Sequence, residues 1–141
     1  MINKIISGIS NKLFENYGSK TEIYTESVVQ NMAEPCFLIN HIESDMDMII
    51  NPRYYFNSRF DILYFSNEFD KYNDCMTVGC ALFSVLEYIP FDNGVIRGTN
   101  MRMTFNDDIL HFYVDYNLLV SNNLDTVDKM QEIEITQEVI N

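Results

Sequence analysis

Residues 94–119 restrict the fold most strongly, because apolar and polar residues alternate on both sides of Asn106-Asp107-Asp108. Met101, Met103 and Phe105 occupy every second position before this tripeptide. After it, the large apolar residues again take every second position: Leu110, Phe112, Val114, Tyr116 and Leu118. Successive side chains of a strand point to opposite faces, so this period of two predicts a half-buried hairpin with its turn at the tripeptide. Since each large apolar side chain contributes roughly 1.5–3 kcal/mol when buried, we expect this hairpin at the centre of a sheet.

The other periodic segments predict two helices and three more strands. Apolar residues recur at three- and four-residue spacing over residues 2–17 and stop before Gly18, which indicates an amphipathic helix. Strands are expected at residues 22–26, 35–42 and 53–65. A second helix is expected from Ser66 or Asn67 to about Tyr88, because Pro90 cannot continue it. Its predicted apolar stripe contains Tyr72, Cys75, Met76, Cys80, Phe83 and Leu86.

The resulting order is helix, three strands, helix and two strands. Two helices with about five mostly antiparallel strands predict an α+β fold with both helices packed on one face of the sheet. A chain of 141 residues fits one domain, which we place at residues 1–120. Residues 121–141 are acidic, with only Lys129 opposing the carboxylates, and Ile133 and Ile135 alternate with polar residues. This segment is either a terminal strand or a tail that becomes ordered on a partner.

Composition excludes several classes of protein. The formal net charge of −12 argues against readout of duplex nucleic acid, which needs clustered Lys and Arg. No apolar run reaches the length of about 18 residues that spans a membrane, and polar residues interrupt the N-terminal apolar run, so we expect no secretion signal and synthesis in the cytoplasm. Three cysteines, Cys36, Cys75 and Cys80, form no C-x-x-C motif and are expected to be small buried thiols.

The candidate chemical groups favour structural roles. His41 and His111 each stand alone in a strand pattern, which predicts hydrogen-bonded strand residues rather than metal ligands or bases. Asp45 with Asp47, and Asp107 with Asp108, offer oxygen ligands for a hard cation but lack the glycine and distal glutamate of a calcium loop. We interpret the first pair as a solvated loop and the second as a turn. The sequence thus predicts no catalytic residue, no metal site and no cofactor.

The segment of residues 43–52 contains the most distinctive candidate interface. Met46, Met48, Ile49 and Ile50 lie in an acidic connection between two predicted strands, where exposure is expected. Flexible methionines suit a surface that packs against a partner. Alternatively, the segment is a strand extension folded into the core. The residues that we consider for an interface are Asp45, Met46, Asp47, Met48, Ile49, Ile50, Arg53, Ile133 and Ile135.

Several segments, in this order, carry a family resemblance. They are INKIISGISNKLFENY, then EIYTESVVQ leading into EPCFLI, then RYYFNSRFDILYF, the helix ending LEYI, and finally RGTNMRMTFNDDILHFYVDYNL. Together they resemble the tail terminator (tail completion) proteins of phages and defective prophages from low-GC Gram-positive bacteria. The resemblance covers about residues 2–120, and the sequence departs from the pattern after Leu119.

The resemblance implies a structural virion protein rather than an enzyme. It implies a homo-oligomeric ring, typically a hexamer, that caps the head-proximal end of the tail tube. Such a ring ends tube polymerisation and provides the joint to the head-side connector. The implied partners are the chain itself, the tail tube protein, a neck or connector protein and, in a contractile tail, the sheath protein. No direct nucleic-acid readout and no membrane contact are expected.

Three other functions stay open at this stage. The first is another neck or head-completion component. The second is an inhibitor that mimics nucleic acid, which the acidic composition suggests. The third, an enzyme acting on a small molecule, lacks the expected set of acid, base and nucleophile in the sequence.

Overall fold

The computed structural model describes residues 1–25, 32–121 and 134–135. The helices are α1 (Ile2–Tyr17) and α2 (Lys71–Val85). The strands are β1 (Glu22–Tyr24), β2 (Cys36–Ile50), β3 (Arg53–Phe65), β4 (Tyr88–Phe91), β5 (Gly94–Asn106), β6 (Ile109–Ser121) and β7 (Glu134–Ile135). In the described part of the chain, no helix is long and apolar enough to cross a membrane.

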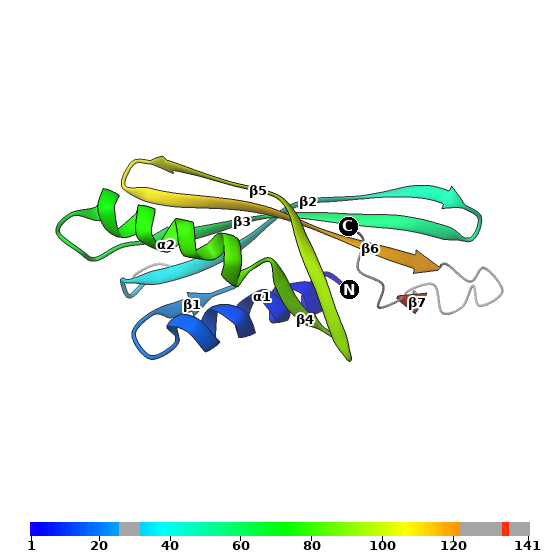
Figure 1. The fold of residues 1–141 in the computed structure, drawn as a ribbon, viewed down its shortest axis with the longest axis horizontal. Coiled ribbons are helices and arrows are strands. Elements are labelled where there is room, and N and C mark those ends of the chain that lie inside the picture. Colours follow the sequence, from blue (N-terminus) through cyan, green and yellow to red (C-terminus); the bar gives the residue numbers. More distant parts are fainter. Residues whose placement is uncertain (26–31, 122–133, 136–141) are drawn as a thin grey trace.

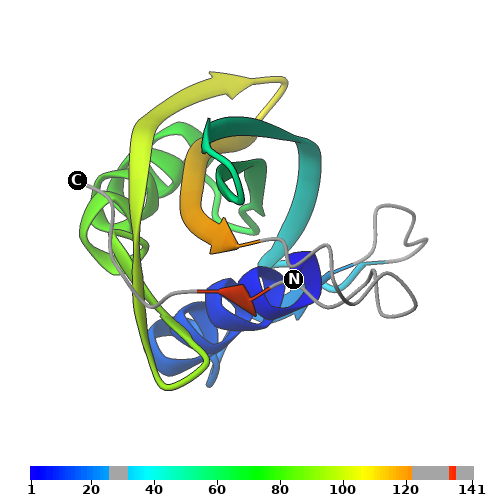
Figure 2. The same ribbon diagram turned by 90° about the vertical axis from the view of Figure 1, so that its right-hand side faces the viewer.

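The strands form one curled sheet (Figures 1 and 2). Their order is β1-β2-β3-β6-β5-β4, with β7 pairing to β6. The pair β1–β2 is parallel, and the other described pairs are antiparallel. The predicted α+β fold is confirmed, and β6 of the predicted hairpin lies inside the sheet between β3 and β5.

The turn of the β5–β6 hairpin matches its sequence. Asp107 and Asp108 have φ angles of 51° and 64°, the left-handed values that a two-residue hairpin turn of type I′ needs at both positions. Aspartate tolerates this conformation better than most residues with a side chain. The interpretation of these two carboxylates as turn residues is therefore confirmed.

Both helices cover one face of the sheet, as predicted. The apolar positions of β3 and β6 point toward them: Phe60, Ile62, Tyr64, Leu110, Phe112, Val114, Tyr116 and Leu118. From α1, Ile5, Ile9 and Leu13 enter the same core with no exposed surface. From α2, Phe83 meets Phe112 edge-on, with ring centroids 5.0 Å apart. Alternation in the strands and helical spacing in α1 thus converge on one core.

The second helix begins later than predicted. Its N-cap is Asp70, whose carboxylate accepts a hydrogen bond from the backbone N–H of Asn73 at 3.1 Å. Ser66 is not the cap, because its hydroxyl donates to Asp74 at 2.6 Å. The buried face of α2 is Cys75, Val78, Gly79 and Leu82, so placing Tyr72 and Cys80 in the apolar stripe was wrong.

A strand that the sequence analysis missed follows α2. The helix ends at Val85, and β4 contains Pro90, the residue that we used only as a helix terminator. In the described sheet β4 is the outermost strand beside β5, so the missing N–H of Pro90 costs no hydrogen bond to a further strand. Gly98 lets β5 cross close to the end of α2, and its N–H donates to the carbonyl of Glu87 at 2.6 Å.

The three cysteines differ in reactivity. Cys36 and Cys75 are buried, whereas Cys80 is exposed, so the expectation of three buried thiols was wrong for Cys80. Burial raises the pKa of both Cys36 and Cys75 to about 11. When the pKa of a thiol is higher by two units, the fraction present as reactive thiolate at pH 8 is about 100-fold lower.

We therefore expect iodoacetamide to modify Cys80 rapidly in the native protein at pH 8 and to leave Cys36 and Cys75 nearly unmodified over the same time. Mass spectrometry of digested protein measures each site. In urea, all three thiols should react at similar rates. Fast native modification of Cys75 would contradict the packing of α2 on the sheet.

Candidate interaction surfaces

A three-stranded arm projects beyond the helices (Figure 1). We define the arm as residues 43–50 of β2, 53–59 of β3 and 115–121 of β6, which pair along their whole length. The sequence analysis placed a connection at residues 43–52, and this was wrong: β2 continues to Ile50, and only Asn51 and Pro52 form the turn. The alternative, a strand extension folded into the core, was right about the strand but wrong about the core, because Met48 and Ile50 are 62% and 66% exposed.

One face of the arm is apolar. Met46 pairs with Phe56 and Met48 pairs with Tyr54, and directly paired residues share a face. We call these four residues the apolar strip. They continue the face that packs against the helices further along the sheet, where Phe60 is buried. Within the strip, Tyr54 and Phe56 are half-buried against the core, whereas Met46 and Met48 are 39% and 62% exposed.

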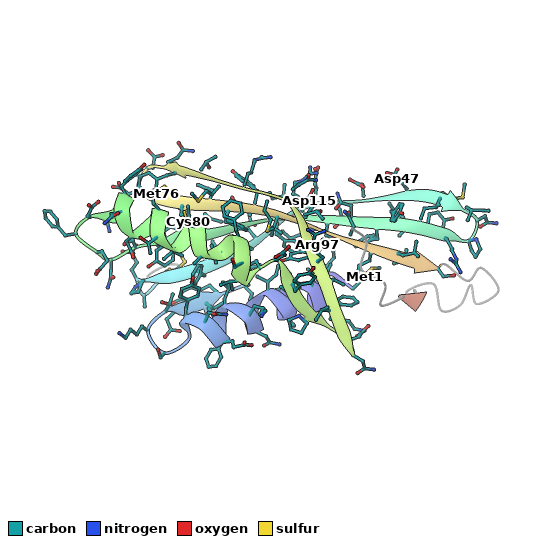
Figure 3. All side chains as sticks on the ribbon, in the orientation of Figure 1. Met1, Asp47, Met76, Cys80, Arg97 and Asp115 are labelled. Atoms are coloured by element: carbon teal, nitrogen blue, oxygen red, sulfur yellow. The ribbon has the colours of Figure 1, made fainter. Side chains whose placement is uncertain are left out.

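The other face of the arm is polar and is anchored by an ion pair between a buried carboxylate and a partly exposed arginine. The side chain of Asp115 is only 2% exposed and receives two hydrogen bonds from Arg59, Nε to Oδ1 at 2.9 Å and Nη2 to Oδ2 at 3.1 Å. Asn100 donates to the same carboxylate at 2.9 Å, and Arg59 also contacts Glu43. Asp115 raises the pKa of Arg59. These contacts link β2, β3, β6 and β5 at the base of the arm, where Figure 3 labels Asp115.

Nearer the tip, this polar face carries a shallow hollow. It is lined by Asp45, Asp47, Tyr55, Asn57 and Asn117. The interpretation of the two aspartates as a solvated loop was wrong about the loop, since both lie on β2, but both side chains are exposed. Among the described residues, no group of three or more His, Cys, Asp and Glu side chains is arranged to hold a metal ion.

Both histidines are hydrogen-bonded strand residues, as predicted. His111 Nδ1 lies 2.8 Å from Asp61 Oδ2, and His41 Nε2 lies 2.8 Å from the Ser44 hydroxyl oxygen. Burial raises the pKa of Asp61, although its contact with His111 acts in the opposite direction. The His111–Asp61 pair joins β6 to β3, whereas His41 and Ser44 both lie on β2.

The structure brings most of the predicted interface residues together. Asp45, Met46, Asp47, Met48, Ile49, Ile50 and Arg53 all lie on the arm. Ile133 lies outside the described residues. Ile135 belongs to β7, where its backbone pairs with Val120 of β6 at the end of the arm. Sequence analysis missed the Arg59–Asp115 pair. Both residues stand at polar positions of their strands, but only the β3–β6 register shows that they face each other.

A projecting arm with exposed apolar side chains, here Met46, Met48, Ile49 and Ile50, is characteristic of a protein that acts by contacting other proteins. A family model described as "Phage tail terminator protein" matches residues 4–128 of the chain. The chain therefore belongs to the phage tail terminator family, and it is a structural protein of the virion tail. This membership confirms the family resemblance noted in the sequence. A comparison with curated proteins finds no match.

Proposed function

We propose that the protein forms a ring, typically of six copies, that caps the head-proximal end of the tail tube. The ring ends tube polymerisation and provides the joint to the head-side connector, without catalysis. The observation that carries this proposal is the arm, together with membership of the tail terminator family. The tail tube protein and a neck protein are the further partners, with a sheath protein added if the tail is contractile.

The arm has the properties that a closed ring needs. A cyclic ring of identical subunits requires one surface of each copy to bind a different surface of the next. The apolar strip offers Met46 and Met48, which are 39% and 62% exposed, so covering each contributes a fraction of the roughly 1.5–3 kcal/mol of a fully buried side chain. Within the described residues, β2 also has no partner strand beyond Leu38 on the side away from β3, which leaves backbone groups for a neighbouring copy. We propose that Asp45, Asp47, Ile49, Ile50 and Arg53 complete this contact.

The C-terminal segment has a second proposed role. We place the folded unit at residues 1–120 and treat residues 121–141 as an acidic extension. The pairing of β7 with the end of β6 supports a terminal strand beside the arm. In the ring, this segment adds its strand to a neighbouring copy, with Ile133 and Ile135 in contact with that copy.

Electron microscopy of particles made without this protein tests the proposed function directly. Overlong tails and tails not joined to heads are expected, because nothing stops tube growth or forms the joint. Tails of normal length combined with heads that lose their DNA would instead identify a head-completion protein and overturn the proposal.

Two substitutions in the apolar strip test the ring contact. Met46→Asp with Met48→Asp is expected to convert the oligomer to monomers in light scattering and to give overlong tails. The reason is that two carboxylates cannot be covered by an apolar partner surface without a desolvation cost of several kcal/mol. The matched control is Val95→Asp, an exposed apolar residue on β5 outside the arm. An unchanged oligomer in the double variant would remove the arm from the ring interface.

Truncation tests the C-terminal segment separately. A chain that ends at Ser121 is expected to fold with an unchanged melting temperature but to form a less stable ring, with a dissociation midpoint at least tenfold higher in protein concentration. Light scattering over a dilution series measures this midpoint. If ring stability and tail length both stay at wild-type values, residues 122–141 do not contribute to assembly.

A further inference from the structure

The end of the molecule opposite the arm presents an exposed aromatic pair. Phe69 is fully exposed and Tyr72 is 61% exposed. Figure 1 shows the start of α2, with the loop before it, at the far end of the long axis from the β2–β3 turn. Tyr72 meets Phe105 of β5 edge-on, with ring centroids 5.4 Å apart. An aromatic contact therefore runs from the start of α2 onto the sheet, and Phe69 lies three residues before Tyr72 in the chain.

The loop that carries Phe69 is held in place by hydrogen bonds on both sides. The Ser66 hydroxyl donates to Asp74 at 2.6 Å and accepts from the backbone N–H of Glu68 at 3.0 Å. Lys71 Nζ donates to the Ser66 carbonyl at 2.6 Å. The phenyl ring is thus presented to solvent by a fixed backbone. A loop whose backbone is already fixed loses little conformational freedom on binding, which favours its use in a protein interface.

The surroundings of the aromatic pair are strongly acidic. Lys71 lines a hollow together with carboxylates from two loops. The carboxylates at this end are Glu34, Glu68, Asp70, Asp74, Asp107 and Asp108. A second copy of this chain that used the same surface is a poor occupant, because the carboxylates of one copy would face those of the other. Like charges brought together at an interface oppose association.

We propose that Phe69 and Tyr72 form a docking site for a different protein of the phage particle, one whose surface is basic around an apolar pocket. Phe69 enters the pocket, and the surrounding carboxylates meet Lys and Arg side chains and steer the approach. The site is separate from the arm, which joins copies of this chain. The proposal rests on the proposed function in one respect, that the partner belongs to the tail or to the head–tail joint.

The test uses the full-length protein with tails and heads isolated from a phage mutant that lacks it. Wild-type protein, Phe69→Ser, Glu68→Lys and the control Phe14→Ser are mixed with each kind of particle, and the amount that co-sediments is measured at low and high salt. Phe14 is also exposed, but it lies on α1. We expect Phe69→Ser to lower retention at least tenfold and Glu68→Lys at least threefold with a weaker salt dependence. Phe14→Ser should stay within twofold of wild type, and light scattering should give all four the same oligomer mass.

Three other outcomes would each contradict the docking site, and one of them would also contradict the proposed function. Wild-type retention of Phe69→Ser on both kinds of particle would overturn the docking site alone. A smaller oligomer mass for Phe69→Ser would show that the patch joins copies of this chain, which also overturns it. If the wild-type protein binds neither tails nor heads, the proposed function and the docking site fail together.

Discussion

Replacement of Phe112 with alanine should lower the free energy of unfolding by about 3–5 kcal/mol. Phe112 lies on β6 in the middle of the sheet, has no exposed surface and packs edge-on against Phe83 of α2. Its removal opens a cavity between the sheet and α2 that the surrounding side chains fill only in part. The expected fall in melting temperature is about 10–20 °C, measured by calorimetry, with the denaturant midpoint as a second measure.

The neighbouring residue provides the control. Tyr113→Ala removes a ring of similar size from the same strand, but Tyr113 points to the opposite, polar face, where Arg102 lies over the ring at 4.5 Å. We expect a loss below about 1 kcal/mol, because this cation–π contact is partly exposed. Equal losses for the two variants would mean that the two faces of β6 are wrongly assigned.

Strand alternation was sufficient to predict the central part of the fold. In β6 every second residue is large and apolar, and in β3 only Ser58 interrupts the same pattern, so the face that packs against the helices follows directly from the sequence. The first helix was predicted with its observed bounds, because Gly18 follows an unbroken apolar stripe. These segments share one property: their local pattern and their tertiary environment agree.

The parts of the fold that were not predicted from the sequence depend on contacts between distant segments. The β2 part of the arm was mistaken for a connection because carboxylates and methionines alternate there without forming a buried face, and only pairing with β3 makes the segment a strand. β4 was missed because Pro90 ends helices in any context, whereas its tolerance in an outer strand depends on the sheet order. Phe69 gave no signal either, since a single aromatic residue before a helix has no periodicity that separates an exposed anchor from a core residue.

The candidate interface was predictable only in part, because the residues that share its face are set by strand pairing. Residues 45–50 and Arg53 attracted notice because apolar side chains in an acidic segment are unusual, and the structure confirms that Met48, Ile49 and Ile50 are exposed. The sequence did not indicate that Tyr54 and Phe56 share a face with Met46 and Met48. That fact follows from the β2–β3 register, which includes shifts after His41 and after Met48.

Replacement of Gly8 with alanine should also destabilise the protein, although propensity alone predicts the reverse. In a solvent-exposed helix this change gains up to about 1 kcal/mol. Gly8 is buried, however, and a Cβ atom there would clash with the backbone carbonyl oxygen of Pro90 in β4. Backbone atoms cannot move aside as a side-chain end can, so α1 or β4 must shift. We expect a net loss of about 1–3 kcal/mol in denaturant unfolding.

Whether Gly8→Ala raises or lowers the free energy of unfolding distinguishes two explanations for the glycine. Ser7→Ala, one position earlier on an exposed part of the same helix, gains helix propensity without a new contact and should be neutral or stabilising by up to about 0.5 kcal/mol. If Gly8→Ala behaves like Ser7→Ala, then α1 does not pack closely against β4. If Gly8→Ala destabilises the protein while Ser7→Ala does not, then Gly8, which weakens α1 as an isolated helix, is the residue that allows α1 to pack closely against β4. The contact between α1 and β4, which no local pattern predicted, would then contribute directly to the stability of the fold.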